Sequence, residues 1–141
     1  MKALDTKLLK IFLKNAGEVL EGDWVLIGGT VLPALGHTIR ATTDIYLIGL
    51  GKKEAGQVLP LMELAESLGL PVESINQAGG YFLSKLKDFE KHLVLLQQGR
   101  KARIYRPDAT LYILLKLRRF SESDAMDCAA WLKWIKTNNE Q

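Results

Sequence analysis

Apolar and polar positions along the chain predict helices at both ends and short strands between them. Residues 24–27 are an uninterrupted apolar run of the kind that fills a buried strand. A second strand is predicted over Asp44–Ile48, where apolar residues follow an acidic one. A first helix is predicted over residues 6–20, because its apolar residues recur at helical spacing: Leu8, Leu9, Phe12, Ala16, Val19 and Leu20.

A glycine pair separates the first strand from a short predicted helix. Gly28 and Gly29 break the apolar run, and Thr30 is expected to cap the helix that follows. Pro33 falls in the first turn of that helix, where a missing N–H group is tolerated. Because glycines allow a close backbone approach and a helix start offers free N–H groups to an anion, this turn is a candidate phosphate cradle.

The middle of the chain predicts another helix and a hairpin. Residues 52–68 have helical periodicity, and Pro60 is expected to kink that helix or split it in two. Residues 72–90 carry the weakest pattern. Residues 92–106 predict a hairpin with Gln98-Gly99 in its turn.

Two helices are predicted at the C-terminal end. Asp108 fits the N-cap of a helix over residues 111–119, with Leu111, Leu114 and Leu115 expected to face the core. A last helix is predicted to begin in residues 121–124 and to carry its two tryptophans on or near the apolar side, at Trp131 and Trp134.

Composition indicates one ordinary globular domain. The chain has 141 residues, of which 48% are hydrophobic and 25% charged, enough for a proper core. It has no apolar run of transmembrane length, and its N-terminus does not have the pattern of a signal peptide. We therefore expect no membrane partner. The single cysteine, Cys128, excludes an internal disulfide and fits a reducing compartment, so we expect a cytoplasmic protein.

Charge is distributed unevenly. The formal net charge is +3, but residues 85–119 hold ten Lys/Arg against three Asp/Glu, a local charge of +7. Such a segment favours contact with phosphates, RNA or an acidic protein partner. The alternative is a solvated surface of helix and hairpin, which is how most charge runs are used.

The order of the glycine turn and the acidic strand resembles a known motif. Gly28-Gly29-Thr30 followed by Thr43-Asp44-Ile45-Tyr46-Leu47 is similar to the motif of the nucleotidyltransferase superfamily that includes DNA polymerase β. It looks closest to the minimal bacterial members, among them those of type IV toxin–antitoxin systems. The resemblance implies an α/β (α+β) fold of one domain, residues 1–141. In it, a mixed sheet of about four strands is flanked by helices, with the core motif at 24–50 and a C-terminal helical pair at 108–136.

The resemblance also implies ligands. Members of the superfamily use Mg²⁺ and a nucleoside triphosphate. The phosphates would lie at Gly28, Gly29 and Thr30, with Arg40 as the basic residue that meets the triphosphate. A surface ion pair is the alternative role for Arg40. Asp44 would be the residual metal-binding carboxylate.

One departure from the motif affects the expected chemistry. The second aspartate of the superfamily falls on Tyr46, and a phenol is neutral near pH 7 and a poor ligand for a hard dication. The third carboxylate usually stands on the strand that corresponds to Leu93–Leu96, which has none. Asp88 and Glu90 precede that strand, and their alternative role is as solvated loop carboxylates.

A secondary motif lies near the C-terminus. Many minimal nucleotidyltransferases end with a Lys-Leu, an Arg and an Asp-x-x-Asp, which resemble Lys116-Leu117, Arg119 and the pair Asp124 and Asp127. Lys116 would then be catalytic. The structural alternative is that Asp124 caps the last helix, that Asp127 favours its first turn, and that the basic residues pair with them.

Three functions stay open on the sequence. The first is a catalytically degenerate nucleotidyltransferase-fold protein that retains nucleotide or phosphate binding. The second is an active Mg²⁺-dependent enzyme that acts on protein or RNA, with Asp44 and a carboxylate from Asp88, Glu90 or Asp127. The third is an antitoxin-like module that binds RNA or protein through residues 85–119. Enzymatic activity is left open because two of three expected metal carboxylates are missing, and the sequence does not indicate an oligomeric state.

Overall fold

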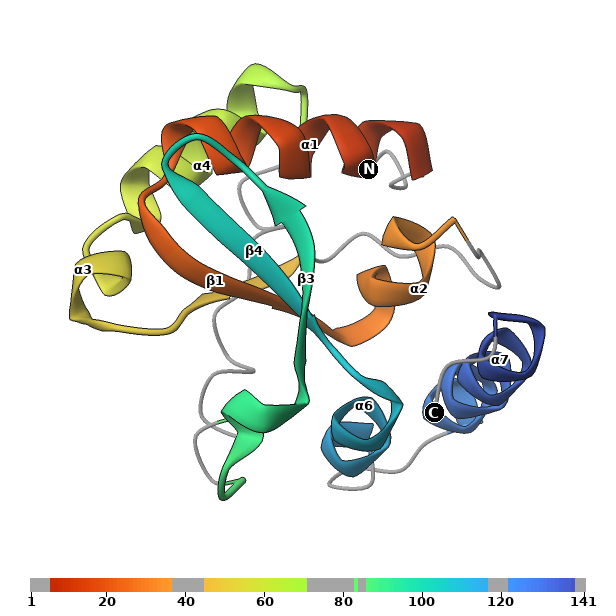
Figure 1. The fold of residues 1–141 in the computed structure, drawn as a ribbon. Helices are drawn as coiled ribbons and strands as arrows, with labels where there is room; N and C mark the ends of the chain where they lie inside the picture. The colour runs from red at the N-terminus through yellow and green to blue at the C-terminus, as the bar shows by residue number, and fades with distance from the viewer. Residues whose placement is uncertain (1–5, 37–44, 71–82, 84–85, 117–121, 139–141) are drawn as a thin grey trace.

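Four strands form one mixed sheet in the order β2-β1-β4-β3 (Figure 1). The structure is a computed structural model that describes residues 6–36, 45–70, 83, 86–116 and 122–138, with the backbone alone at 55, 116 and 122–127. The strands are β1 (Gly22–Ile27), β2 (Tyr46–Gly49), β3 (Leu93–Gln98) and β4 (Ala102–Pro107). The predicted mixed sheet with flanking helices and a C-terminal helical pair is confirmed.

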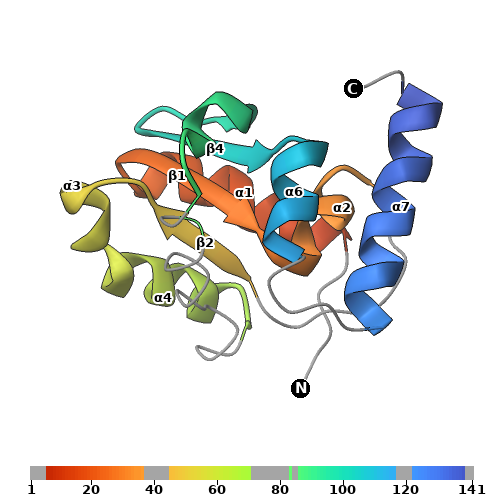
Figure 2. The same cartoon turned by 90° about the horizontal axis from the view of Figure 1, so that it is seen from below.

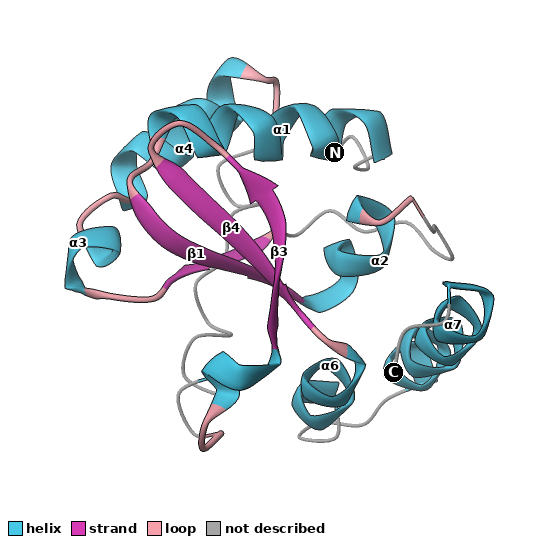
Figure 3. Ribbon diagram, viewed as in Figure 1, coloured by secondary structure: helices cyan, strands magenta, loops and turns pink. Residues whose placement is uncertain are grey.

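The strand pairing brings the ends of β1 and β4 to one edge of the sheet (Figure 3). β1 is antiparallel to β2, with Ile27 opposite Tyr46, and parallel to β4, with Val25 opposite Tyr105. β3 and β4 form the predicted antiparallel hairpin, but its turn is 99–101 and not the predicted Gln98-Gly99 pair. The residues that follow β1 and β4 and those that begin β2 and β3 therefore lie along the same edge.

Helices cover both faces of the sheet. The main core lies between the sheet and helices α1 (Thr6–Val19), α2 (Val31–Ala34) and α4 (Val58–Ser67). Apolar side chains at every third or fourth position of α1 place Leu9, Phe12 and Ala16 in this core. A second cluster covers the opposite face, with Val25, Ile27, Ile48, Leu83 and Leu111 buried.

The predicted helix over 52–68 is split, but not at Pro60. α3 (Lys52–Ala55) ends before Gly56, and α4 begins at Val58. Pro60 is the third residue of α4. The N–H groups of the first helical turn have no acceptor within the helix, so a proline there loses no hydrogen bond. In both Figure 1 and Figure 2, α3 lies at one end of the molecule and α7 (Glu122–Asn138) at the other.

The two C-terminal helices pack through aromatic side chains. Tyr112 of α6 (Ala109–Lys116) is buried, and its ring centroid lies 5.1 Å from that of Trp131 in α7. The Arg106 guanidinium at the end of β4 lies 5.6 Å from the ring centroid of Trp131 and 5.3 Å from that of Trp134. The prediction that Leu114 faces the core is wrong, because Tyr112 faces α7 and leaves Leu114 43% exposed. Within the described residues, no helix is long and apolar enough to span a membrane.

Candidate phosphate site

The turn after β1 continues directly as a helix. Residues Gly28–Thr30 form a 3-10 turn that leads into α2, and Ile27 before it is extended, with φ −127° and ψ 172°. The 3-10 turn therefore starts at Gly28, two residues before Thr30, although Gly28 itself has a left-handed φ of +81°. In a 3-10 turn each N–H bonds the carbonyl three residues earlier, so the N–H groups that this turn offers to an anion are those of Gly28 and Gly29.

Thr30 holds the N-cap position of α2, as predicted, but its side chain does not cap the helix. Its backbone is helical, with φ −89° and ψ −8°, and its side chain makes no capping hydrogen bond. The side chain is fully buried, and its Oγ1 atom has no hydrogen-bond partner within the described part of the chain. A buried hydroxyl cannot contact a ligand at the surface, so the Thr30 side chain does not contribute to the candidate cradle.

Tyr46 lies directly against Gly28. Gly28 has φ +81°, and a β-carbon built on it would lie 2.6 Å from Cδ2 of the Tyr46 ring. The ring is half-buried and packs on the second apolar cluster, beside the strand pair that Ile27 forms with Tyr46. The lack of a side chain at Gly28 is thus required by the Tyr46 ring and by a left-handed backbone, before any ligand is considered.

The described residues do not fit a magnesium site. The position of the superfamily's second aspartate carries the Tyr46 phenol, which packs against Gly28. The described ranges contain no group of three or more His, Cys, Asp or Glu that could hold a metal ion. Asp44 and Arg40, the predicted carboxylate and the predicted phosphate-binding arginine, lie outside the described residues.

The two loop residues predicted as sources of a third carboxylate do not point into the structure. Asp88 and Glu90 are exposed, and Asp88 has a left-handed backbone with φ +58° at the start of the 3-10 turn Phe89–His92. Glu54 of α3 is a buried carboxylate, but its Oε2 accepts a hydrogen bond of 2.8 Å from the backbone N–H of Asp23. Asp23 is near the start of β1, at the other end of that strand from Gly28.

Sequence reasoning missed a histidine–aspartate pair at the edge of the sheet. His92, just before β3, has its Nδ1 atom 2.8 Å from Oδ2 of Asp108, which follows β4. Oδ1 of Asp108 accepts a hydrogen bond from the backbone N–H of Leu111, which confirms the predicted N-cap. The backbone N–H of Asp108 also donates to the His92 carbonyl. No local sequence signal reveals the pair, since it depends on how β3 and β4 align.

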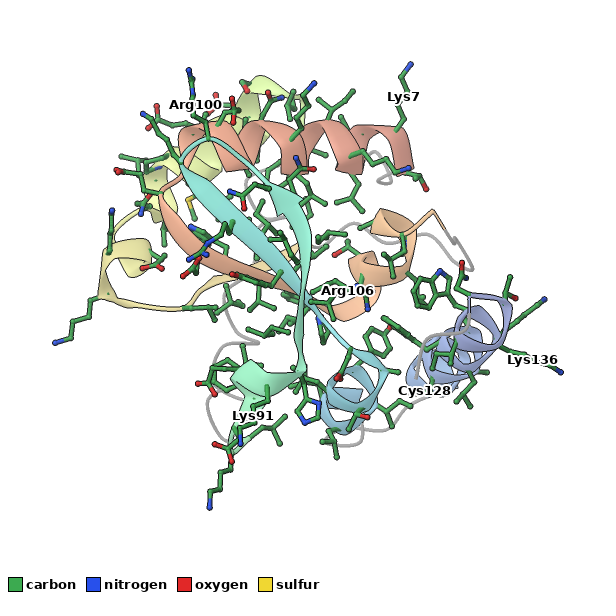
Figure 4. All side chains as sticks on the ribbon, viewed as in Figure 1. Lys7, Lys91, Arg100, Arg106, Cys128 and Lys136 are labelled. Atoms are coloured by element: carbon green, nitrogen blue, oxygen red, sulfur yellow. The ribbon has the colours of Figure 1, made fainter. Side chains whose placement is uncertain are left out.

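The described arginines of the basic segment 85–119 do not lie on one surface. Arg103 forms two hydrogen bonds of 2.9 and 3.2 Å with the carboxylate of Asp23, which raises the pKa of its guanidinium. Arg106 is buried beside the tryptophans of α7, and Arg100 lies near Glu18. Figure 4 shows Lys91 and Arg100 at opposite sides of the molecule. The described part of this positive charge is therefore divided among several environments.

The secondary motif lies on the C-terminal helices. Lys116 is the last residue of α6, and Asp124 and Asp127 are in the first two turns of α7. The backbone of these residues is described and their side chains are not, while Arg119 lies outside the described residues. The catalytic and the structural roles of this motif stay predictions.

The fold and the glycine turn define a class of protein. A mixed sheet whose first strand ends in Gly-Gly and pairs with the motif-bearing strand is the arrangement implied by the nucleotidyltransferase resemblance. A family model described as "Nucleotidyltransferase of unknown function (DUF6036)" matches residues 1–132. The chain therefore belongs to this nucleotidyltransferase family. No curated protein and no solved structure matches it.

Proposed function

We propose that this chain binds the phosphate groups of a nucleotide at the turn Gly28–Thr30, and that metal-dependent nucleotidyl transfer has been lost. Membership of a nucleotidyltransferase family supports a nucleotide ligand. The helical turn supports the position of the phosphates, because its first N–H groups have no intrahelical acceptors. Arg40 is proposed as the charged partner, since a guanidinium binds phosphate oxygens through two parallel hydrogen bonds.

The observation that carries the loss of metal chemistry is the contact between Tyr46 and Gly28. The ring occupies one side of the turn and replaces a carboxylate at the motif position with an uncharged group. Asp44 alone would give a dication one negative charge, and a Mg²⁺ ion shared with substrate phosphates normally has more than one carboxylate. Binding is therefore proposed to depend on backbone N–H groups and Arg40, and to proceed without metal.

Calorimetric titration with ATP in EDTA tests the phosphate-binding part of the proposal. Gly29→Leu and Arg40→Ala should each weaken binding at least 10-fold, because one fills the turn and the other removes the charged partner. Gly56→Leu and Arg100→Ala are matched controls at exposed positions away from the turn. Normal affinity in Gly29→Leu, or equal losses in the controls, would refute the assignment of the turn.

Metal-dependent transfer is the alternative function. It would require Asp44 to act with a carboxylate from Asp88, Glu90 or Asp127. Nothing in the described residues favours this set, since Asp88 and Glu90 are exposed. The alternative predicts that EDTA abolishes nucleotide binding in the wild type, whereas the proposal predicts that EDTA leaves the affinity unchanged.

A further inference from the structure

Three lysines form a row along the outer side of α1. Lys7, Lys10 and Lys14 are spaced by three and four residues, which places them on one side of a helix, and all three are exposed. None of them forms an ion pair with a residue that the structure describes. At a rise of 1.5 Å per residue, the row extends over about 10 Å. These lysines are therefore free to meet an external anion.

The turn between β3 and β4 extends this row beyond the end of α1. The backbone N–H of Lys101 donates to the carbonyl of Gly17 over 3.1 Å, and that of Arg100 donates to Oε2 of Glu18 over 2.6 Å. Lys101 is exposed, and the Arg100 side chain is 76% exposed although its Nε lies 3.7 Å from Glu18. Figure 4 shows Lys7 and Arg100 projecting from the same side of the molecule, at opposite ends of α1.

We refer to these five cations as the α1 basic row: Lys7, Lys10, Lys14, Arg100 and Lys101. Glu18 is the acidic residue of α1 that lies beside them, so five positive charges and one negative charge give a net +4. The segment 85–119 supplies only two members of the row. The surface combines residues that are more than 80 positions apart in sequence, which is why the charge run alone did not reveal it.

The row offers charge and little apolar surface. The opposite side of α1 is buried, with Leu9, Phe12 and Ala16 in the main core, so the helix cannot insert an apolar face into a membrane. Among the large apolar residues of α1, Ile11 and Val19 are exposed, at 40% and 49%. Protein–protein interfaces are enriched in aromatic residues and depleted of lysine, whereas phosphate backbones are bound mainly through Lys and Arg. The composition of the row therefore favours nucleic acid over an acidic protein.

We propose that the α1 basic row binds the phosphate backbone of double-stranded RNA. No described residue of α1 or of the 99–101 turn beside the row is an exposed aromatic on which the bases of a single strand could stack, so a duplex is favoured. Duplex RNA is recognised through phosphates and ribose 2′-hydroxyls, and largely without regard to sequence. Asn15 follows Lys14 and carries an amide that can both donate to and accept from a 2′-hydroxyl.

This surface is separate from the nucleotide site proposed above. The helix that follows the glycine turn, α2, packs with the buried side of α1 in the main core, whereas the α1 basic row lies on the exposed side of α1. The inference does not rest on the proposed function. Nucleotide binding and RNA binding are measured separately on the same variants. Either proposal can therefore be refuted while the other stands.

The test is fluorescence anisotropy of a short blunt RNA duplex between about 50 and about 200 mM salt. Neutralising four phosphates predicts a slope of log K against log salt of about −3.6, taking about −0.9 per phosphate from B-form DNA. The triple variant K7Q/K10Q/K14Q should reduce this slope by about 2.7 and weaken binding on the order of 100-fold at 100 mM salt. The matched control K52Q/K133Q/K136Q removes the same charge from exposed positions off the row and should bind as the wild type does.

Four results would overturn the proposal. They are no binding by the wild type at the lowest salt, equal losses in the two triple variants, equal or tighter binding of duplex DNA, and tighter binding of polyglutamate than of RNA. Asn15→Ala should weaken RNA binding and leave any residual DNA binding unchanged; an effect of equal size on both would remove the argument for RNA. Circular dichroism and ATP titration should be unchanged in all variants, since every substituted side chain lies on the surface or at its margin.

Discussion

Substituting alanine for Gly28 tests the contact on which the account of the site depends. Gly28 has φ +81°, and a left-handed backbone costs a residue with a side chain about 1–2 kcal/mol. The new methyl group would also lie 2.6 Å from Cδ2 of Tyr46, and overpacking of this kind costs about 1–3 kcal/mol. Gly28→Ala should therefore destabilise the protein by about 2–5 kcal/mol.

A double-mutant cycle separates the two contributions. In a Tyr46→Ala background the ring is absent, so Gly28→Ala should cost only the backbone contribution of about 1–2 kcal/mol. The coupling between the two positions should then be about 1–3 kcal/mol. Tyr46→Phe should leave the full cost, because the clash is with the ring and not with the hydroxyl.

Urea unfolding followed by tryptophan fluorescence gives the required free energies, provided that m is unchanged. Tyr105 is a matched control, since it is also half-buried and packs on the same apolar cluster. Gly28→Ala should cost as much in Tyr105→Ala as in the wild type. If Gly28→Ala cost the same in the wild type and in Tyr46→Ala, the ring would not lie against Gly28, and the argument against a metal at this position would lose its basis.

Three further substitutions test the surrounding structure, each by urea unfolding. Arg106→Met removes a cation from two indole rings of α7 and should lower the free energy of unfolding by about 1–2 kcal/mol. An unchanged urea midpoint would contradict the cation–π contact. Asp108→Ala removes the N-cap of α6 and the partner of His92, and should lower the free energy of unfolding by about 1–2 kcal/mol. Asp108→Asn should keep most of the capping energy, and equal losses in the two variants would argue against the cap. Gly99→Ala places a methyl group on the backbone of Gly17 and should cost about 2–3 kcal/mol, whereas a neutral result would exclude this close approach.

Most of the fold follows from local patterns in the sequence. Helical periodicity predicts α1, the apolar run 24–27 predicts β1, and Asp108 predicts the start of α6. At Leu114, a tertiary contact overrides the local preference. Leu114 has the right spacing for the core, but Tyr112 takes the side that faces α7 because its ring packs against an indole.

The candidate site was only partly predictable. The glycine turn and the missing carboxylate are visible in the motif, because both are residue identities at fixed spacing. The position of the Tyr46 ring against Gly28 depends on the antiparallel register of two strands, and the His92–Asp108 pair depends on the hairpin register. Neither register can be read from a single strand. The α1 basic row likewise requires the turn 99–101 to lie beside the end of α1.

The most direct test of the central claim is calorimetric titration of nucleoside triphosphates with Mg²⁺ and with EDTA, on the wild type and on Tyr46→Asp. The account predicts that the wild type binds a triphosphate with the same affinity in both conditions, and that Tyr46→Asp acquires Mg²⁺-dependent binding because a second carboxylate joins Asp44. Mg²⁺-dependent binding by the wild type would contradict the account. It would mean that a second carboxylate completes a working metal site with Asp44, as the alternative function requires.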